Sequence, residues 1–216
     1  MPSAQLSLVL SVLIVLAGCA GNPMSGDDGG RPEGAGQAAN TARQSPVSTR
    51  AIPPEPELTE VQQQLVERAR TAAASQAWDD AAQALEQLLQ QRDDLPRLTA
   101  RLAWVRQQQG RTAEATTLYR DAVAANPADA LSINNLALLL REAGDFRQAS
   151  EVLEQGLAYS PQVPELHFNL AVLSELYLLD LPRALDHYRQ YQALLPTPEK
   201  RVEGWIADIE RRVDES

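Results

Sequence analysis

The spacing of apolar residues changes near residue 58 and then stays constant to the end of the chain. From Leu58 onward, alanines and large apolar residues recur three and four positions apart, separated by Gln, Arg, Glu and Asp. This spacing places the apolar side chains on one face of an α-helix, whereas a half-buried strand would alternate apolar and polar residues. The sequence therefore predicts an all-helical domain.

The helical pattern itself repeats every 34 residues. The residues that recur at this spacing are Ala69, Ala103, Ala137 and Ala171; Ala81, Ala115 and Ala149; Leu85, Tyr119 and Leu153; Gly110 and Gly144; and Pro127 and Pro161. Ala184 and Tyr188 continue two of these series one residue late. A 34-residue period with two helices per unit resembles the tetratricopeptide repeat.

Each recurring residue type has a physical reason. We expect the alanines where two antiparallel helices cross closely, and glycine in a left-handed C-cap at the turn between them. Proline then ends the second helix. Asp145 and Asp180 are expected to cap second helices, and Phe146 to fill the space between helices.

The resemblance implies an all-α fold, a right-handed tetratricopeptide superhelix of about four helix-turn-helix repeats with a C-terminal capping helix, preceded by a disordered linker. The repeat domain spans residues 58–198, with units at about 62–95, 96–129, 130–163 and 164–198. The first unit lacks the turn glycine and the closing proline, and the fourth has one extra residue between 177 and 182.

Residues 199–216 are predicted to form the capping helix. Thr197-Pro198-Glu199 is typical of a helix start, and an apolar stripe follows. The stripe consists of Val202, Trp205, Ile206, Ile209 and Val213. A solenoid needs an end helix with one polar face. The alternative is a helix that binds a partner or a membrane surface.

The N-terminus indicates a compartment. Residues 6–17 are uncharged and apolar, a run too short to span a membrane and suited to a secretory signal. The closing Leu16-Ala17-Gly18-Cys19 resembles the lipobox of bacterial lipoproteins. The resemblance implies that residues 1–18 are removed, that Cys19 carries acyl chains such as palmitate, and that the protein faces the periplasm, with Ala20 favouring the outer membrane. Residues 19–57, rich in Gly, Pro and Ser, are predicted to be a disordered tether.

Composition limits the chemistry. A net charge of −10 argues against nucleic-acid binding, and the single cysteine allows no internal disulfide. The two histidines, His167 and His187, are interpreted as packing or surface residues. With neither a phosphate loop nor a nucleophile elbow in the sequence, we expect no enzymatic activity, no metal and no cofactor.

The first helix of each tetratricopeptide unit lines the concave groove, so the resemblance implies a set of groove residues. They are Arg97, Arg101, Trp104, Asn134, Asn135, Leu138, Arg141, Phe168, Asn169 and Val172. Asn135 and Asn169, one period apart, could contact a peptide backbone or neighbouring helices. Trp104 could anchor a ligand or pack between helices, and the arginines could bind an acidic segment.

These features predict a lipid-anchored scaffold or adaptor that binds a protein or peptide in an envelope assembly, such as pilus or secretion biogenesis. Alternatives are an adaptor for peptidoglycan hydrolases or for outer-membrane protein assembly, a self-associating structural protein forming a homodimer, and an accessory enzyme of the cell wall. The groove lacks the Lys and Asn pattern of two-carboxylate clamps.

Overall fold

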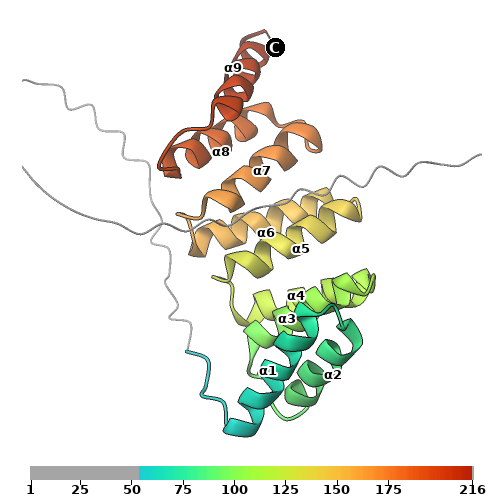
Figure 1. Ribbon diagram of the computed structural model, residues 1–216. Helices are drawn as coiled ribbons and strands as arrows, with labels where there is room; N and C mark the ends of the chain where they lie inside the picture. Colours follow the sequence, from blue (N-terminus) through green and yellow to red (C-terminus); the bar gives the residue numbers. More distant parts are fainter. Residues whose placement is uncertain (1–53, 216) are drawn as a thin grey trace, which may run out of the picture. The chain divides into compact units, whose positions relative to one another are not determined.

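The computed structural model describes residues 54–215, and Figure 1 shows them as successive helix pairs. The predicted signal peptide, Cys19 and the tether as far as residue 53 lie outside the described residues. The helices are α1 (Glu60–Ala74), α2 (Trp78–Leu89), α3 (Pro96–Gln108), α4 (Thr112–Ala125), α5 (Ala130–Glu142), α6 (Phe146–Tyr159), α7 (Pro164–Leu176), α8 (Leu181–Leu194) and α9 (Lys200–Asp214). Within this part of the chain, no strand occurs. The predicted all-helical repeat fold is confirmed for it.

Each helix packs mainly against its neighbours in sequence. The contacts within the pairs α1–α2, α3–α4, α5–α6 and α7–α8 are the most extensive, and the pairs join through α2–α3, α4–α5 and α6–α7. The alanines expected at the crossings are buried: Ala103 and Ala115 have no exposed surface. Small side chains let the two helix backbones approach closely at these points.

The turns between paired helices use a left-handed residue at one repeat position. Gly110 and Gly144 have φ of 75° and 85°, as the sequence predicted. In α5, the Gly144 amide donates to the Arg141 carbonyl at 3.0 Å and the Asp145 amide to the Leu140 carbonyl at 2.8 Å. This pair of bonds is a Schellman motif, which satisfies carbonyls at the helix end.

The predicted helix caps differ from each other. The Asp180 carboxylate accepts a hydrogen bond from the Arg183 amide at 3.2 Å, so this cap is confirmed. Asp145 occupies the N-cap position of α6, but its side chain makes no capping hydrogen bond, so that prediction was wrong. Its ψ of 55° is further from the extended conformation of a typical N-cap than the 82° of Asp180.

The last helix covers the end of the stack. Val202 and Ile209 of α9 are fully buried. They lie in a cluster with Tyr188 of α8 and, from α7, Phe168 and Val172. The capping helix predicted from the apolar stripe is therefore observed.

Candidate protein-binding site

A cleft of 680 Å³ lies between α3 and the start of α5. It brings together four of the residues that the sequence assigned to the groove. These are Arg97, Arg101, Trp104 and Asn135. The remaining lining residues are Ala100, Tyr119, Asn126, Asp129, Leu131 and Ser132. The cleft therefore combines cations, amides and apolar surface in one concavity, as binding sites commonly do.

One face of α3 supplies three of these four predicted residues. Arg97, Arg101 and Trp104 are four and three residues apart, so they follow one another along that face. Trp104 is 40% exposed and meets the ring of Trp78 edge-on, with centroids 5.3 Å apart. It also lines a second cleft of 220 Å³ together with Arg70 and Arg101. Trp104 thus packs between helices and still offers part of its ring to a ligand.

The arginines that line these two clefts differ in their partners. Arg97 lies 3.8 Å from the Glu55 carboxylate, and Arg70 forms an ion pair with Glu67 at 2.7 Å. The exposed Arg101 guanidinium has no hydrogen-bond or ion-pair partner within residues 54–215. Arg101 is therefore the cation that an incoming carboxylate could bind without breaking an existing contact.

The asparagines are engaged inside the protein. Asn135 donates from Nδ2 to the Tyr119 hydroxyl at 3.0 Å, and Asn169 donates from Nδ2 to Asn134 Oδ1. Burial raises the pKa of Tyr119 to about 12, against the opposite effect of the bond from Asn135. Each amide therefore makes a contact between helices, which was the alternative to peptide binding. Peptide contact by Asn135 and Asn169 stays a prediction.

Several predicted groove residues lie away from this cleft. Phe168 and Val172 pack beneath α9, where Phe168 contacts the rings of Tyr191 and Trp205. Leu138 and Arg141 are half-buried on α5 and do not line the cleft. The groove position of the fourth unit is thus occupied by the chain's own last helix.

Leu131 is the most exposed of the six lining residues that the sequence did not predict. Its side chain is 70% exposed at the mouth of the cleft. The repeat register could have identified it, because Leu131 lies 34 residues after Arg97 and so occupies the same place in its helix. Tyr119 and Asp129 also line the cleft. The Asp129 carboxylate is held by the Ser132 hydroxyl at 2.6 Å and the Leu131 amide at 3.2 Å.

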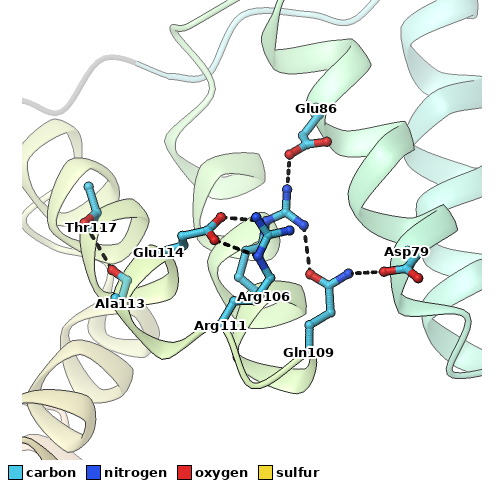
Figure 2. Close-up of polar contacts among 8 residues, drawn as sticks. All are labelled: Asp79, Glu86, Arg106, Gln109, Arg111, Ala113, Glu114 and Thr117. Carbon is cyan, nitrogen blue, oxygen red and sulfur yellow. Dashed lines mark hydrogen bonds and ion pairs between the residues drawn. The ribbon is translucent and has the colours of Figure 1, made fainter.

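A polar network around the buried Arg106 side chain fixes α3 on its other side (Figure 2). Arg106 is only 7% exposed. Its guanidinium binds the carboxylates of Glu86 from α2 and Glu114 from α4, the latter at 3.5 Å, and donates to Gln109 Oε1 at 2.8 Å. Gln109 in turn donates to Asp79 Oδ1 at 2.6 Å. This network joins the first two units and holds the helix that carries Arg97, Arg101 and Trp104.

The two histidines pair with each other between α7 and α8. The Pro161 carbonyl only accepts hydrogen bonds, so His167 Nε2, 3.1 Å away, must donate to it. His167 Nδ1 then accepts from His187 Nδ1 at 3.0 Å. Burial, followed by the effects of His167 and Arg183, lowers the pKa of His187 to about 4. Across the described residues, no group of three or more His, Cys, Asp and Glu is placed to hold a metal ion.

Comparisons with known proteins agree with this fold. The tetratricopeptide repeat family model matches residues 134–197. A solved tetratricopeptide repeat protein from Parabacteroides merdae has a TM-score of 0.63 at 18% identity, covering 73% of this chain and 63% of that one. PilF of Pseudomonas aeruginosa has a TM-score of 0.59 at 20% identity, covering 72% and 70%.

One curated relative is similar over a short stretch. The protein O-mannosyl-transferase Tmtc2 of Drosophila melanogaster is 38% identical over 53 residues, which are 24% of this chain. The match covers only 5% of Tmtc2. None of the helices within residues 54–215 combines the length and the apolar composition that crossing a membrane requires.

Proposed function

We propose that this protein is a lipid-anchored scaffold of a bacterial cell envelope, and that it binds a segment of a partner protein in the cleft between α3 and α5. The tetratricopeptide fold is suited to protein–protein contact. The observation that carries the proposal is the meeting of three groups in one cleft: exposed Leu131, part-exposed Trp104 and unpaired Arg101. Aromatic and arginine side chains in a pocket are typical binding hot spots.

The chemistry of the cleft describes the segment that would bind. Leu131 and Trp104 offer apolar surface at the mouth and along α3. Arg101 offers an unneutralised guanidinium beside them. A segment with one apolar side chain next to a carboxylate would satisfy both, because an arginine pairs with a carboxylate through two parallel hydrogen bonds.

Photo-crosslinking tests the partner surface. A photoreactive residue at Leu131 should give a discrete adduct in envelope preparations, and adding Trp104→Ala should abolish that adduct. Val61, 63% exposed on α1, is the matched control position. The same adducts from both positions would contradict binding in the cleft.

The anchor is tested separately. Cys19→Ser removes the thiol that the lipobox resemblance assigns to acylation, so the protein should leave the membrane fraction. A protein that still sediments with membranes would contradict the proposed lipid anchor. The assembly served could be pilus or secretion biogenesis, peptidoglycan hydrolysis or outer-membrane protein assembly, and the crosslinked partner would identify which.

Self-association is the second candidate, because the α7–α8 turn exposes large apolar side chains. Leu176 is 60% exposed and Leu179 77%, and Tyr177 beside them stacks on Phe146 with ring centroids 4.5 Å apart. Leu179 also has φ of 56°, which is unusual for leucine. Sedimentation velocity should then give a dimer that Leu179→Ser converts to monomer. A monomer at every concentration would exclude this candidate.

A further inference from the structure

The turn between α7 and α8 carries a leucine that the packing of the chain does not explain. Leu179 has a left-handed φ of 56°, and its side chain is 77% exposed. The corresponding turn residues of the second and third units are Gly110 and Gly144. Glycine at residue 179 would relieve the backbone strain, and the exposed leucine recovers little of that strain by burial. Strain of this kind at an exposed apolar residue points to a function at the surface.

The turn is held in place on both sides of Leu179. The Asp180 amide donates to the Ser174 carbonyl at 2.8 Å, and the Tyr177 ring stacks on Phe146 with centroids 4.5 Å apart. Leu179 therefore protrudes from a preformed turn. A binding site that receives this turn does not have to order it first, which lowers the entropic cost of association.

Asp180 adds a carboxylate next to Leu179. Its side chain is exposed, and Oδ1 accepts a hydrogen bond from the Arg183 amide at 3.2 Å. Within residues 54–215, the other oxygen, Oδ2, has no hydrogen-bond partner. The tip of the turn thus presents an apolar side chain and an available carboxylate oxygen side by side.

The cleft between α3 and α5 offers the complementary groups. Arg101 is its unpaired cation, and Trp104 and Leu131 supply apolar surface. Residues three apart on a helix, such as Arg101 and Trp104, have Cβ atoms about 5–6 Å apart. Leu179 and Asp180 are neighbours, with Cα atoms about 3.8 Å apart. One turn can therefore contact the guanidinium and the apolar surface at the same time.

We propose that the α7–α8 turn of a second copy of this protein binds in the cleft, with Leu179 against Trp104 and Asp180 paired with Arg101. This inference rests on the proposed function of the cleft. The contact does not form within one copy, because the turn is fixed to α7 and α8 and the pair α5–α6 lies between these helices and α3 (Figure 1).

The contact joins two different surfaces, so each pair of copies keeps one free turn and one free cleft. Contacts of this head-to-tail kind build open-ended assemblies unless the rotation between copies closes a ring. A symmetric contact between two turns would stop at the dimer instead. Another partner that binds the same cleft competes with the next copy, so its capture ends the assembly.

Two blocked variants of full-length Cys19→Ser protein test the contact. Arg101→Glu places a like charge opposite Asp180, and Leu179→Gly removes the apolar tip at a position that suits glycine. In sedimentation velocity, the unblocked protein should form oligomers that grow beyond the dimer with concentration, and each variant alone should be a monomer. Mixed in equal amounts, the two variants should form a dimer and nothing larger, because only one intact turn and one intact cleft can meet.

Asp180→Asn measures the carboxylate alone. Asparagine is as good an N-cap as aspartate, so α8 should stay intact while the dissociation constant for self-association rises about tenfold. Val61→Ser, at a site 63% exposed on α1, is the control and should leave that constant unchanged.

The outcomes separate this proposal from the alternatives. A dimer formed by Arg101→Glu alone would assign self-association to a symmetric contact between turns and overturn the proposal. An unblocked protein that stays monomeric at every concentration would also overturn it. In that case, a photo-crosslink from Leu131 to a different protein would leave the binding function of the cleft standing.

Discussion

The junction between the first two repeats and the junction between the last two both contain buried leucines, but they differ in the contacts added to that packing. At the first, the buried Arg106 guanidinium reaches carboxylates on α2 and α4 (Figure 2). At the second, Ile133 and Leu166, both fully buried, meet over Gly156 of α6. One sequence period therefore produces, in the same stack, a junction with a buried cation (the polar junction) and a junction with this close apolar contact (the apolar junction). Leucines are buried at both.

The two kinds of contact contribute differently to the orientation of helices and to the free energy of unfolding. A buried ion pair pays a desolvation cost that offsets much of its attraction, so it adds little net stability, while the directions of its hydrogen bonds fix geometry. Buried leucine and isoleucine supply stabilisation without such a cost. We infer that the Arg106 network mainly orients α3, which carries the cleft residues, and that the apolar contact of Ile133 and Leu166 contributes more to the free energy of unfolding.

The largest expected effect is at the apolar junction. Leu166→Ala removes a side chain with no exposed surface and should lower the free energy of unfolding by about 3 kcal/mol, through lost burial and a residual cavity. Urea denaturation measures it. Leu176→Ala on the same helix, at an exposed site, should change the value by less than about 0.5 kcal/mol. Equal losses from the two variants would contradict the assignment.

The close approach at Gly156 gives the next effect. A Cβ at this position would lie 2.8 Å from Ile133 Cγ2, so Gly156→Ala should destabilise by about 2 kcal/mol through overpacking. At Gly204, exposed in α9, no atom lies within 4 Å of an added Cβ. Gly204→Ala should instead stabilise by about 0.5–1 kcal/mol, because alanine favours the helix. Thermal melts of Gly156→Ala and Gly204→Ala measure both effects. A shift of the two melting temperatures in the same direction would contradict the close approach at Gly156.

At the polar junction, stability should depend on the charge of the substituted side chain more than on its volume. Glu86→Ala leaves the buried guanidinium one carboxylate short and should cost about 1–2 kcal/mol, a value reduced by the part-exposure of Glu86. Arg106→Met, which keeps much of the buried side-chain volume and removes the charge, should cost less than about 1 kcal/mol. Urea unfolding of both variants provides the test. A larger loss for Arg106→Met than for Leu166→Ala would reverse the proposed division between the junctions.

The smallest effect concerns pH and lies in the fourth unit. The groups facing His187 are His167 from α7, and Arg183 and Asp186 from α8. Its pKa falls from 6.5 to about 4 on folding, so the unfolded chain binds more protons between those values. Stability from the neutral ring is present above pH 6.5 and is lost as pH falls toward 4.

The expected loss is about 0.5–1 kcal/mol after allowance for solvent screening at a part-exposed ring. Melting temperatures at pH 7 and pH 4.5 should show a larger drop for the native protein than for His187→Gln. An identical drop would show that other groups cause the acid response.

The sequence predicted the repeats because each turn and crossing depends on a local rule. Gly110 and Gly144 mark left-handed turns, and Ala103 with Ala115 marks a close crossing. In the first and fourth units, the corresponding turn residues are Gln76 and Leu179, and they are also left-handed. A rule that looks for glycine cannot predict these two turns. There the packing of the paired helices sets the turn despite the side chain.

The candidate site was predicted in part, because the repeat register gives a helix face but not what covers it. Arg97, Arg101 and Trp104 line the cleft as the register implies. Phe168 and Val172 occupy groove positions, but α9 packs over them, and this contact depends on a helix outside the repeat. Arg106 gave no sequence signal as a junction residue, since its partners are on two other helices.

The central claim is that the cleft between α3 and α5 binds a partner protein. The most direct measurement uses titration calorimetry with the partner that crosslinks at Leu131. Its affinity is compared for the native protein and for the Arg101→Ala, Trp104→Ala double variant. We predict at least a roughly tenfold loss of affinity, about 1.4 kcal/mol, with helical circular dichroism unchanged. Unchanged affinity in a folded double variant would contradict the claim.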